Sequence, residues 1–208
     1  MPSSATRIVL QQHVTDDDVQ GVAWDLDWNA ISVSDRKQAT WVDAWATMDG
    51  ATSIHYVHDG PIGMRYFMIR GHDTVGVAQR IVDTCPTWTL ANALDAARLA
   101  TERDDRLTAV YAMALTAPDD PDPAVSIELR RAAADPDPGI RQSVVIATAY
   151  LGWPDLVTLV EELQRADPVD DIRHNAGIML TGLRKYGPGN SPHASPRRWL
   201  RRRRNGNP

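Results

Sequence analysis

The clearest pattern of apolar positions along the chain lies in residues 89–185, where it predicts helices. Apolar side chains recur at positions i, i+4 and i+7, a spacing that places them on one side of a helix. Six segments show this spacing and form three consecutive pairs; first helices begin near Leu90, Val125 and Leu156, and second helices near Leu107, Ile140 and Ile172. Successive first helices are 35 and 31 residues apart and successive second helices 33 and 32. The pattern therefore predicts three copies of one helical hairpin.

Prolines and aspartates mark the boundaries between these helices. The stretch APDDPDPA precedes the second pair, DPDPG separates its two helices, and LGWPD opens the third pair. Proline is tolerated in the first turn of a helix, and aspartate accepts hydrogen bonds from the free N–H groups there. Because each helix has one narrow apolar side that it cannot bury alone, we expect antiparallel hairpins stacked into an α-solenoid.

The helical segment resembles the HEAT family of helical repeats in three features. These are the length of the pairs, an Asp-Pro turn between the helices, and an Ile-Arg dipeptide at the start of the second helix. The turn and the dipeptide occur in DPDPGIRQ at 135–142 and in DPVDDIRH at 167–174. The resemblance covers residues 89–185, a little under half of the chain.

The resemblance also implies a ladder of ion pairs that holds adjacent repeats together. In the family, a turn aspartate and an arginine six residues later typically form this ladder. Asp135 with Arg141, and Asp167 with Arg173, have this spacing. In the first pair Thr108 occupies the position of the arginine, as expected of a terminal repeat.

Residues 1–88 show the shorter patterns of strands and turns. In GVAWDLDWNAISV, apolar residues alternate with polar ones, which predicts a strand; a helix that starts at Thr15 is the alternative for the beginning of this segment. Asp-Gly pairs at 49–50 and 59–60 separate segments rich in β-branched and aromatic residues, and they predict hairpins. The stretch HDTVGVAQRIVDTC predicts a short helix after the last strand.

Together these patterns predict an α+β protein, with a small antiparallel β-sheet module followed by an α-solenoid of HEAT-like helical hairpins. We place the α+β module at residues 1–88 and the three hairpins at residues 89–186. Residues 187–208 hold proline, glycine, serine and asparagine around an arginine cluster. Because nothing in this last segment can pack into a core, we expect a disordered tail.

Charge is distributed unevenly along the chain. The net charge of −5 includes the six arginines of the tail, and without them 16 basic residues face 27 acidic ones, a net charge of −11. A body this acidic is a poor general binder of nucleic acid, because phosphate contacts supply most non-specific affinity. The tail is basic, so we expect it to attract nucleic acid, an anionic membrane surface or an acidic protein. The acidic body of this same chain is one such protein surface. Its arginines are Arg197, Arg198, Arg201, Arg202, Arg203 and Arg204.

Other features indicate a bacterial, cytoplasmic protein. Only two of the basic residues are lysines, and this bias, with the many alanines, aspartates and prolines, suggests a high-GC bacterial genome. The chain has no apolar run long enough to span a bilayer, and its start lacks the features of a secretory signal. The single cysteine, Cys85, excludes an internal disulfide and fits a reducing compartment.

The side chains with most potential for chemistry lie in IHYVHDG and in RGHD beyond it. Imidazoles such as His55, His58 and His72 are ligands that suit zinc or iron. On a strand, however, His55 and His58 point to opposite faces because their separation is odd. We therefore assign no metal site and no cofactor. Cys85 has no catalytic motif around it, and no Gly-x-Ser-x-Gly elbow or Gly-rich phosphate loop occurs, so the sequence does not predict an enzyme.

Two sets of residues are candidates for contact with a partner. Four tryptophans within 22 residues form either the core of the sheet or an exposed aromatic patch; they are Trp24, Trp28, Trp41 and Trp45. In HEAT-like arrays the second helices line one surface, which implies a second set that faces a partner. This set is Gln142, His174 and Asn175, with Arg141 and Arg173 shared between the ladder and this surface.

Three functions follow from these observations. The leading hypothesis is a non-catalytic protein–protein interaction module (an adaptor, a regulatory subunit or an immunity-type inhibitor) that binds a protein partner through the solenoid. The alternative is a nucleic-acid-associated protein that binds through the arginine-rich tail. The third is a metal-dependent hydrolase that uses His55, His58 and His72.

Overall fold

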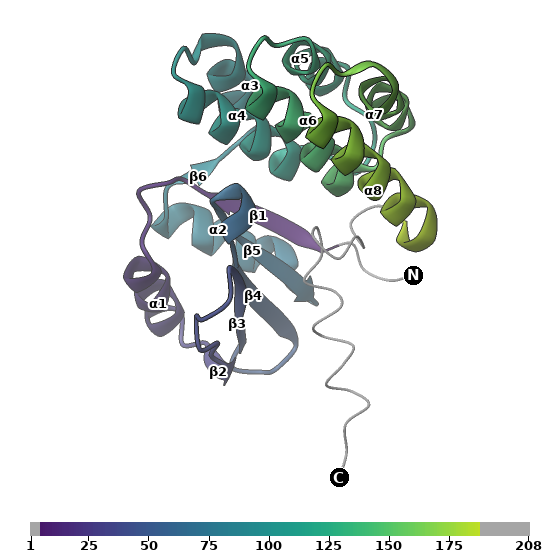
Figure 1. Cartoon of the computed structure of the whole chain (residues 1–208). Helices are drawn as coiled ribbons and strands as arrows, with labels where there is room; N and C mark the ends of the chain where they lie inside the picture. Colours follow the sequence, from purple (N-terminus) through teal and green to yellow (C-terminus); the bar gives the residue numbers. More distant parts are fainter. Residues whose placement is uncertain (1–4, 188–208) are drawn as a thin grey trace. The chain divides into compact units, whose positions relative to one another are not determined.

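The computed structural model describes residues 5–187, which form an antiparallel sheet followed by a stack of helices (Figure 1). The chain divides into two compact units, Met1–Thr89 and Leu90–Pro208, so the division lies one residue from the boundary expected from the sequence. The predicted α+β class, with a small antiparallel sheet ahead of the helices, is confirmed. Within the described residues, no helix is both long and apolar enough to cross a membrane.

The N-terminal unit is built on an antiparallel sheet with the strand order β2-β3-β4-β5-β1-β6. Its strands are β1 (Thr6–Leu10), β2 (Asn29–Ser32), β3 (Thr40–Ala46), β4 (Thr52–Asp59), β5 (Met64–Gly71) and β6 (Thr87–Trp88). The helices of this unit are α1 (Asp16–Asp25) and α2 (Thr74–Thr84), with a short 3-10 helix at Gly60–Ile62. Both Asp-Gly pairs lie where strands turn back, between β3 and β4 and between β4 and β5.

Glycine is required at the second of these turns. The N–H of Gly60 donates to the carbonyl oxygen of Ala39 at 3.0 Å, which holds the turn against the chain entering β3. A Cβ atom at position 60 would collide with that same carbonyl oxygen. A residue without a side chain is therefore needed for the two backbones to approach this closely.

The strand predicted in GVAWDLDWNAISV is wrong over its first half, which is the C-terminal part of helix α1. Thr15 caps this helix: its hydroxyl accepts a hydrogen bond from the N–H of Asp18, and the Asp18 carboxylate accepts one from the N–H of Thr15. This capping box satisfies two N–H groups at the helix start. The helix then buries Val19 and Val22 on one side, while Trp24 is 82% exposed. A helix from Thr15 was the alternative, and the strand begins only at β2.

The core of the N-terminal unit lies between α1, α2 and one face of the sheet. Side chains of alternate residues on β3, β4 and β5 meet apolar side chains of the two helices. Trp28, Trp41 and Trp45 belong to this core, and Trp28 packs edge-on against Phe67 with ring centroids 6.0 Å apart. Cys85 is buried in the same cluster, and burial raises the pKa of its thiol.

The C-terminal unit is a two-layer stack of helical hairpins (Figure 1). The helices are α3 (Leu90–Leu99), α4 (Arg103–Thr116), α5 (Pro123–Ala133), α6 (Pro138–Leu151), α7 (Pro154–Ala166) and α8 (Asp170–Tyr186). They pair as α3 with α4, α5 with α6, and α7 with α8. Between hairpins, α5 contacts α3 and α7 in one layer, and α6 contacts α4 and α8 in the other. All six segments with helical spacing are therefore helices, in the predicted pairs.

Aspartate and proline start the helices of the second hairpin, as the sequence predicts. Asp122 accepts hydrogen bonds from the N–H groups of Ala124 and Val125, and Pro123 follows it as the first helical residue. Asp137 accepts from the N–H of Gly139 in the same way, with Pro138 at the first helical position. These caps position the turn between α5 and α6, which carries Asp135.

Candidate interaction surface

A buried ion pair joins the second hairpin to the turn of the third. Nε of Arg141 donates to Oδ2 of Asp167 at 2.7 Å, and Nη2 donates to Oδ1 at 3.0 Å. Nη1 of the same arginine donates to the carbonyl oxygens of Asp135 and Pro136, in its own turn. The hydrogen bonds from Arg141 hold the pKa of the Asp167 carboxyl below its usual value. This bidentate geometry fixes both the distance and the orientation between neighbouring hairpins.

The first and second hairpins are joined in the same way, by an arginine that the sequence did not indicate. Arg106 on α4 forms an ion pair with the carboxylate of Asp135. Asp135 also accepts from the N–H of Asp137 at 2.9 Å, just as Asp167 accepts from the N–H of Val169 at 2.9 Å. Each turn aspartate therefore shapes its own turn and binds the arginine of the preceding hairpin.

Arg141 and Arg173 differ in where their carboxylate partners lie. Arg141 binds the backbone of Asp135, and its carboxylate partner is Asp167 of the next hairpin. Arg173 likewise donates to the backbone oxygen of Asp167 at 2.6 Å, but its carboxylate partner is Asp170 on its own helix. In both ion pairs between hairpins, the arginine belongs to one hairpin and the aspartate to the turn of the next.

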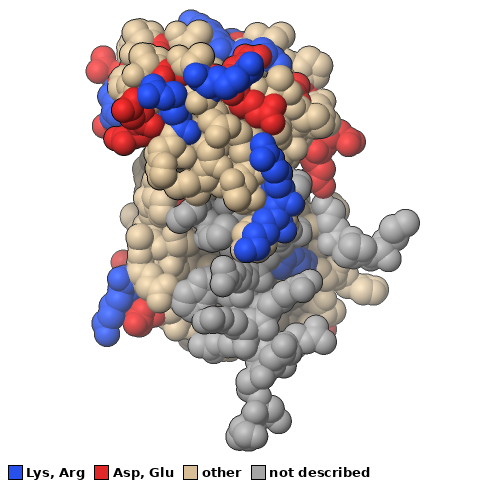
Figure 2. Space-filling model, turned by 45° about the vertical axis from the view of Figure 1, so that its right-hand side comes forward, with Lys and Arg blue, Asp and Glu red and all other residues tan. Residues whose placement is uncertain are grey.

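A hollow of about 500 Å³ lies on the last hairpin, between α7 and α8. Its lining residues are Gln164, Arg173, His174, Gly177, Ile178 and Thr181. Ile178 is 52% exposed, so the hollow offers an apolar side chain beside the cationic one of Arg173. Figure 2 brings this end of the stack forward and shows basic and acidic side chains interspersed on the helical unit.

The residues expected to face a partner fall into three groups. Arg141 was expected to be shared between the ladder and the surface; it is buried in its ion pair with Asp167 and therefore belongs to the ladder alone. Gln142 accepts a hydrogen bond from Asn175 at 3.3 Å, which links α6 to α8. Arg173 and His174 line the hollow. The structure therefore places two of the five residues at one candidate contact surface.

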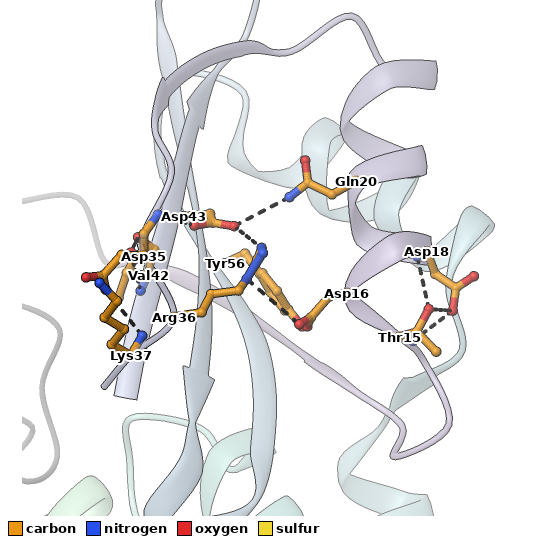
Figure 3. A network of polar contacts seen from close by, with 11 residues as sticks. Thr15, Asp16, Asp18, Gln20, Asp35, Arg36, Lys37, Val42, Asp43 and Tyr56 are labelled. Carbon is orange, nitrogen blue, oxygen red and sulfur yellow. Dashed lines mark hydrogen bonds and ion pairs between the residues drawn. The ribbon is translucent and has the colours of Figure 1, made fainter. Parts of the chain in front are cut away.

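A second polar cluster lies in the N-terminal unit, around the fully buried carboxylate of Asp43 (Figure 3). Asp43 accepts from the N–H of Ser34 and from Nη2 of Arg36, each at 2.7 Å, and from the amide of Gln20 at 3.4 Å. Arg36 adopts a positive φ of 57° to reach it. The cluster joins α1 and the loop before β3 to the sheet, and its hydrogen bonds account for the burial of a charged group.

Tyr56 extends this cluster to the start of α1. Its hydroxyl donates to Oδ1 of Asp16 at 2.7 Å, and burial together with this carboxylate raises the pKa of the phenol. Arg36 also lies over the ring of Trp41, 4.4 Å from its centroid. The cluster was not predicted from the sequence, although a signal was present: Asp43 has the same strand parity as Trp41 and Trp45, which are buried.

The structure does not bring the three histidines together. His58 stacks on Trp41 with ring centroids 5.0 Å apart, on the face of the sheet that the helices cover. His55 lies on the opposite face, and burial lowers its pKa. His72 follows β5. Among residues 5–187, no group of three or more histidine, cysteine or acidic side chains is placed to hold a metal ion.

The tryptophans do not form one exposed aromatic patch. Trp28, Trp41 and Trp45 are buried in the core, and Trp24 is the exposed member of the four. The arginines of the tail, at positions 197, 198 and 201–204, lie outside the described residues.

Comparison with known proteins provides no further guide to the function of these surfaces. No protein-family model, no curated protein and no solved structure matches this chain.

Proposed function

We propose that this protein is a non-catalytic interaction module, an adaptor or regulatory protein that binds a protein partner through its stack of HEAT-like hairpins. The observation that carries the proposal is the hollow on α7 and α8. The resemblance to HEAT-like arrays led us to expect that Arg173 and His174 face a partner, and both line this hollow beside the exposed Ile178. Interfaces combine an apolar contact and an arginine in this way more often than other surfaces do.

A comparison of surface variants tests this function. The full chain is used to capture proteins from an extract of its source cells, and bound proteins are identified by mass spectrometry. Ile178→Asp and Arg173→Glu alter the hollow without touching the core, so we expect both to lose a partner that the unmodified chain retains. Arg184→Glu, on the same helix but outside the hollow, is the matched control. Equal capture by all four chains would contradict an interaction at this surface.

The alternative function, binding of nucleic acid, is supported by the sequence of the tail. Six arginines between positions 197 and 204 give this segment a charge opposite to that of the acidic body. We expect a chain that ends at Gly187 to lose salt-sensitive binding of a mixed-sequence DNA duplex, measured by fluorescence anisotropy. Binding that is unchanged by the truncation would exclude the tail as its source.

A further inference from the structure

The hollow on the last hairpin is lined by the counterparts of residues that bind a hairpin elsewhere in the stack. Second helices repeat at an offset of 32 residues here, so Arg173 corresponds to Arg141 and His174 to Gln142. One hairpin earlier, Arg141 binds Asp167 and Gln142 binds Asn175, and both of these partners belong to the following hairpin. The last hairpin of the described stack therefore presents the side of the interface that carries the arginine.

The internal interface also shows which chemical group this surface fits. Asp167 meets Arg141 as a turn aspartate that directly follows α7, and one of its oxygens accepts a hydrogen bond from the N–H of Val169 just before α8. Arg173 is positioned like Arg141, since its Nη1 donates to the backbone oxygen of the turn aspartate. A carboxylate that arrives on a turn between two helices would meet Arg173 as Asp167 meets Arg141.

The carboxylate that Arg173 now binds is a weak competitor. Asp170 is three residues away on the same helix, and its side chain is 87% exposed. Exposed ion pairs of this kind contribute little because water screens the two charges. By contrast, the side chain of Asp167 in the internal pair is 1% exposed. A partner that covers the hollow and excludes water from it would therefore compete well for Arg173.

We propose that the end of the stack formed by α7 and α8 is a seat for a helical hairpin of a partner protein, whose inter-helix turn offers an aspartate to Arg173. This inference rests on the proposed function and names the chemistry of the partner. A different protein is favoured over a second copy because the turn aspartates of this chain, Asp135 and Asp167, are already bound to Arg106 and Arg141. In the first hairpin the corresponding acid is a glutamate, Glu102, which makes no capping bond.

A tandem chain tests the seat without a known partner. Leu183 corresponds to Leu151, so a second copy of residues 152–183 inserted after Leu183 continues the repeat in register. In the inserted copy, Arg173→Gln and Ile178→Asp remove the features of the hollow from the new end. We expect this chain to fold with a Tm higher by roughly 5 °C or more, followed by circular dichroism at 222 nm, because the fourth hairpin buries the hollow.

A double-mutant comparison isolates the contact to Arg173. Arg173→Gln at the original position should lower Tm by about 4 °C or less in the parent chain, where it breaks an exposed pair and one hydrogen bond to a backbone oxygen. In the tandem chain it should lower Tm by roughly 6 °C or more, because it leaves the new turn aspartate buried without its partner. Equal losses in the two chains, or no gain in Tm on insertion, would overturn the seat.

The partner supplies a second measurement that separates this inference from the proposed function. A partner captured by the parent chain should be lost by the tandem chain, whose seat is filled and whose new end lacks the arginine. Undiminished capture by the tandem chain would contradict the proposed seat for a hairpin but would still agree with the proposed interaction module. Self-association of the parent chain that Glu102→Gln and Arg173→Gln both abolish, measured by sedimentation, also overturns the proposal because the occupant is then a second copy.

Discussion

The two units of this protein each bury a carboxylate against an arginine, but they use the pair differently. In the N-terminal unit, Asp43 binds Arg36 and Ser34, within nine residues in sequence, and the tie closes a local loop on the sheet. In the C-terminal unit, Arg141 and Asp167 are 26 residues apart and belong to different hairpins. The local tie has both partners within one loop, whereas the tie between repeats needs a following hairpin, and within residues 5–187 no following hairpin offers a carboxylate to Arg173.

Breaking the tie between hairpins should have the largest effect. Arg141→Met leaves the carboxylate of Asp167 buried without its partner, so we expect the free energy of unfolding to fall by about 3–5 kcal/mol. Urea denaturation followed by circular dichroism at 222 nm measures this. The control is Arg184→Met, which removes an exposed pair with Glu161 and should cost about 0–1 kcal/mol. Equal losses would show that the buried pair does not hold the hairpins together.

The same tie predicts how stability depends on acid. The pKa of Asp167 is lowered in the folded state, first by its hydrogen bonds from Arg141. Its contribution is therefore full above the ordinary carboxyl pKa, about 3.9, and is lost as pH falls through the lowered value. We expect Asp167→Asn to be less stable at pH 7 and to lose less stability than the parent between about pH 5 and pH 2. Parallel curves for the two chains would contradict this assignment.

Breaking the local tie should have a smaller effect, confined to the N-terminal unit. Asp43→Ala leaves the N–H of Ser34 and the guanidinium of Arg36 without their acceptor, and we expect a loss of roughly 2–3 kcal/mol. Tryptophan fluorescence reports it, since Trp41 and Trp45 lie beside the cluster. Asp35→Ala is the control, because Asp35 is exposed, and should change stability by about 0.5 kcal/mol or less. A loss that also appears in the helical transition would mean that the tie is not local.

The smallest effect is expected at the exposed tryptophan. Trp24 lies on the solvent side of α1, so Trp24→Ser should change the free energy of unfolding by about 0.5 kcal/mol or less. Trp45→Ala removes a ring that is 3% exposed and should cost about 3–5 kcal/mol in the same measurement. A large loss at position 24 would show that the ring has a structural role that its exposure does not reveal.

The helical unit was more predictable from sequence than the sheet, and the reason is physical. Each hairpin repeats the same apolar spacing and the same Asp-Pro turns, so six independent segments agree on one register. In GVAWDLDWNAISV only one segment was available, and its alternation of apolar and polar residues competed with a capping box at Thr15. The cap decided the outcome because it satisfies N–H groups that a strand would have paired elsewhere.

The candidate site was predictable only in part. Repeat register and the resemblance to HEAT-like arrays together indicated Arg173 and His174, because spacing gives a position on a helix face and the resemblance gives the face that meets a partner. Arg141 was expected to serve both the ladder and the surface, and its burial away from the surface depends on the carboxylate of Asp167 reaching it from the next hairpin. Arg106 was missed for a related reason: it stands two residues from the position where the ladder arginine was expected, and its reach to Asp135 is a property of the folded stack.

The position of each hairpin in the stack has a consequence for local opening. Helix α6 packs against α4, α5, α7 and α8, whereas α8 packs against α6 and α7 at the end of the described stack. Opening the last hairpin breaks one interface between hairpins, while exposing α6 breaks two. Backbone amides of α8 should therefore exchange with deuterium sooner than those of α6 in native conditions. A hairpin seated on the hollow would slow exchange in α8, so protection of this one helix would report when the surface is in use.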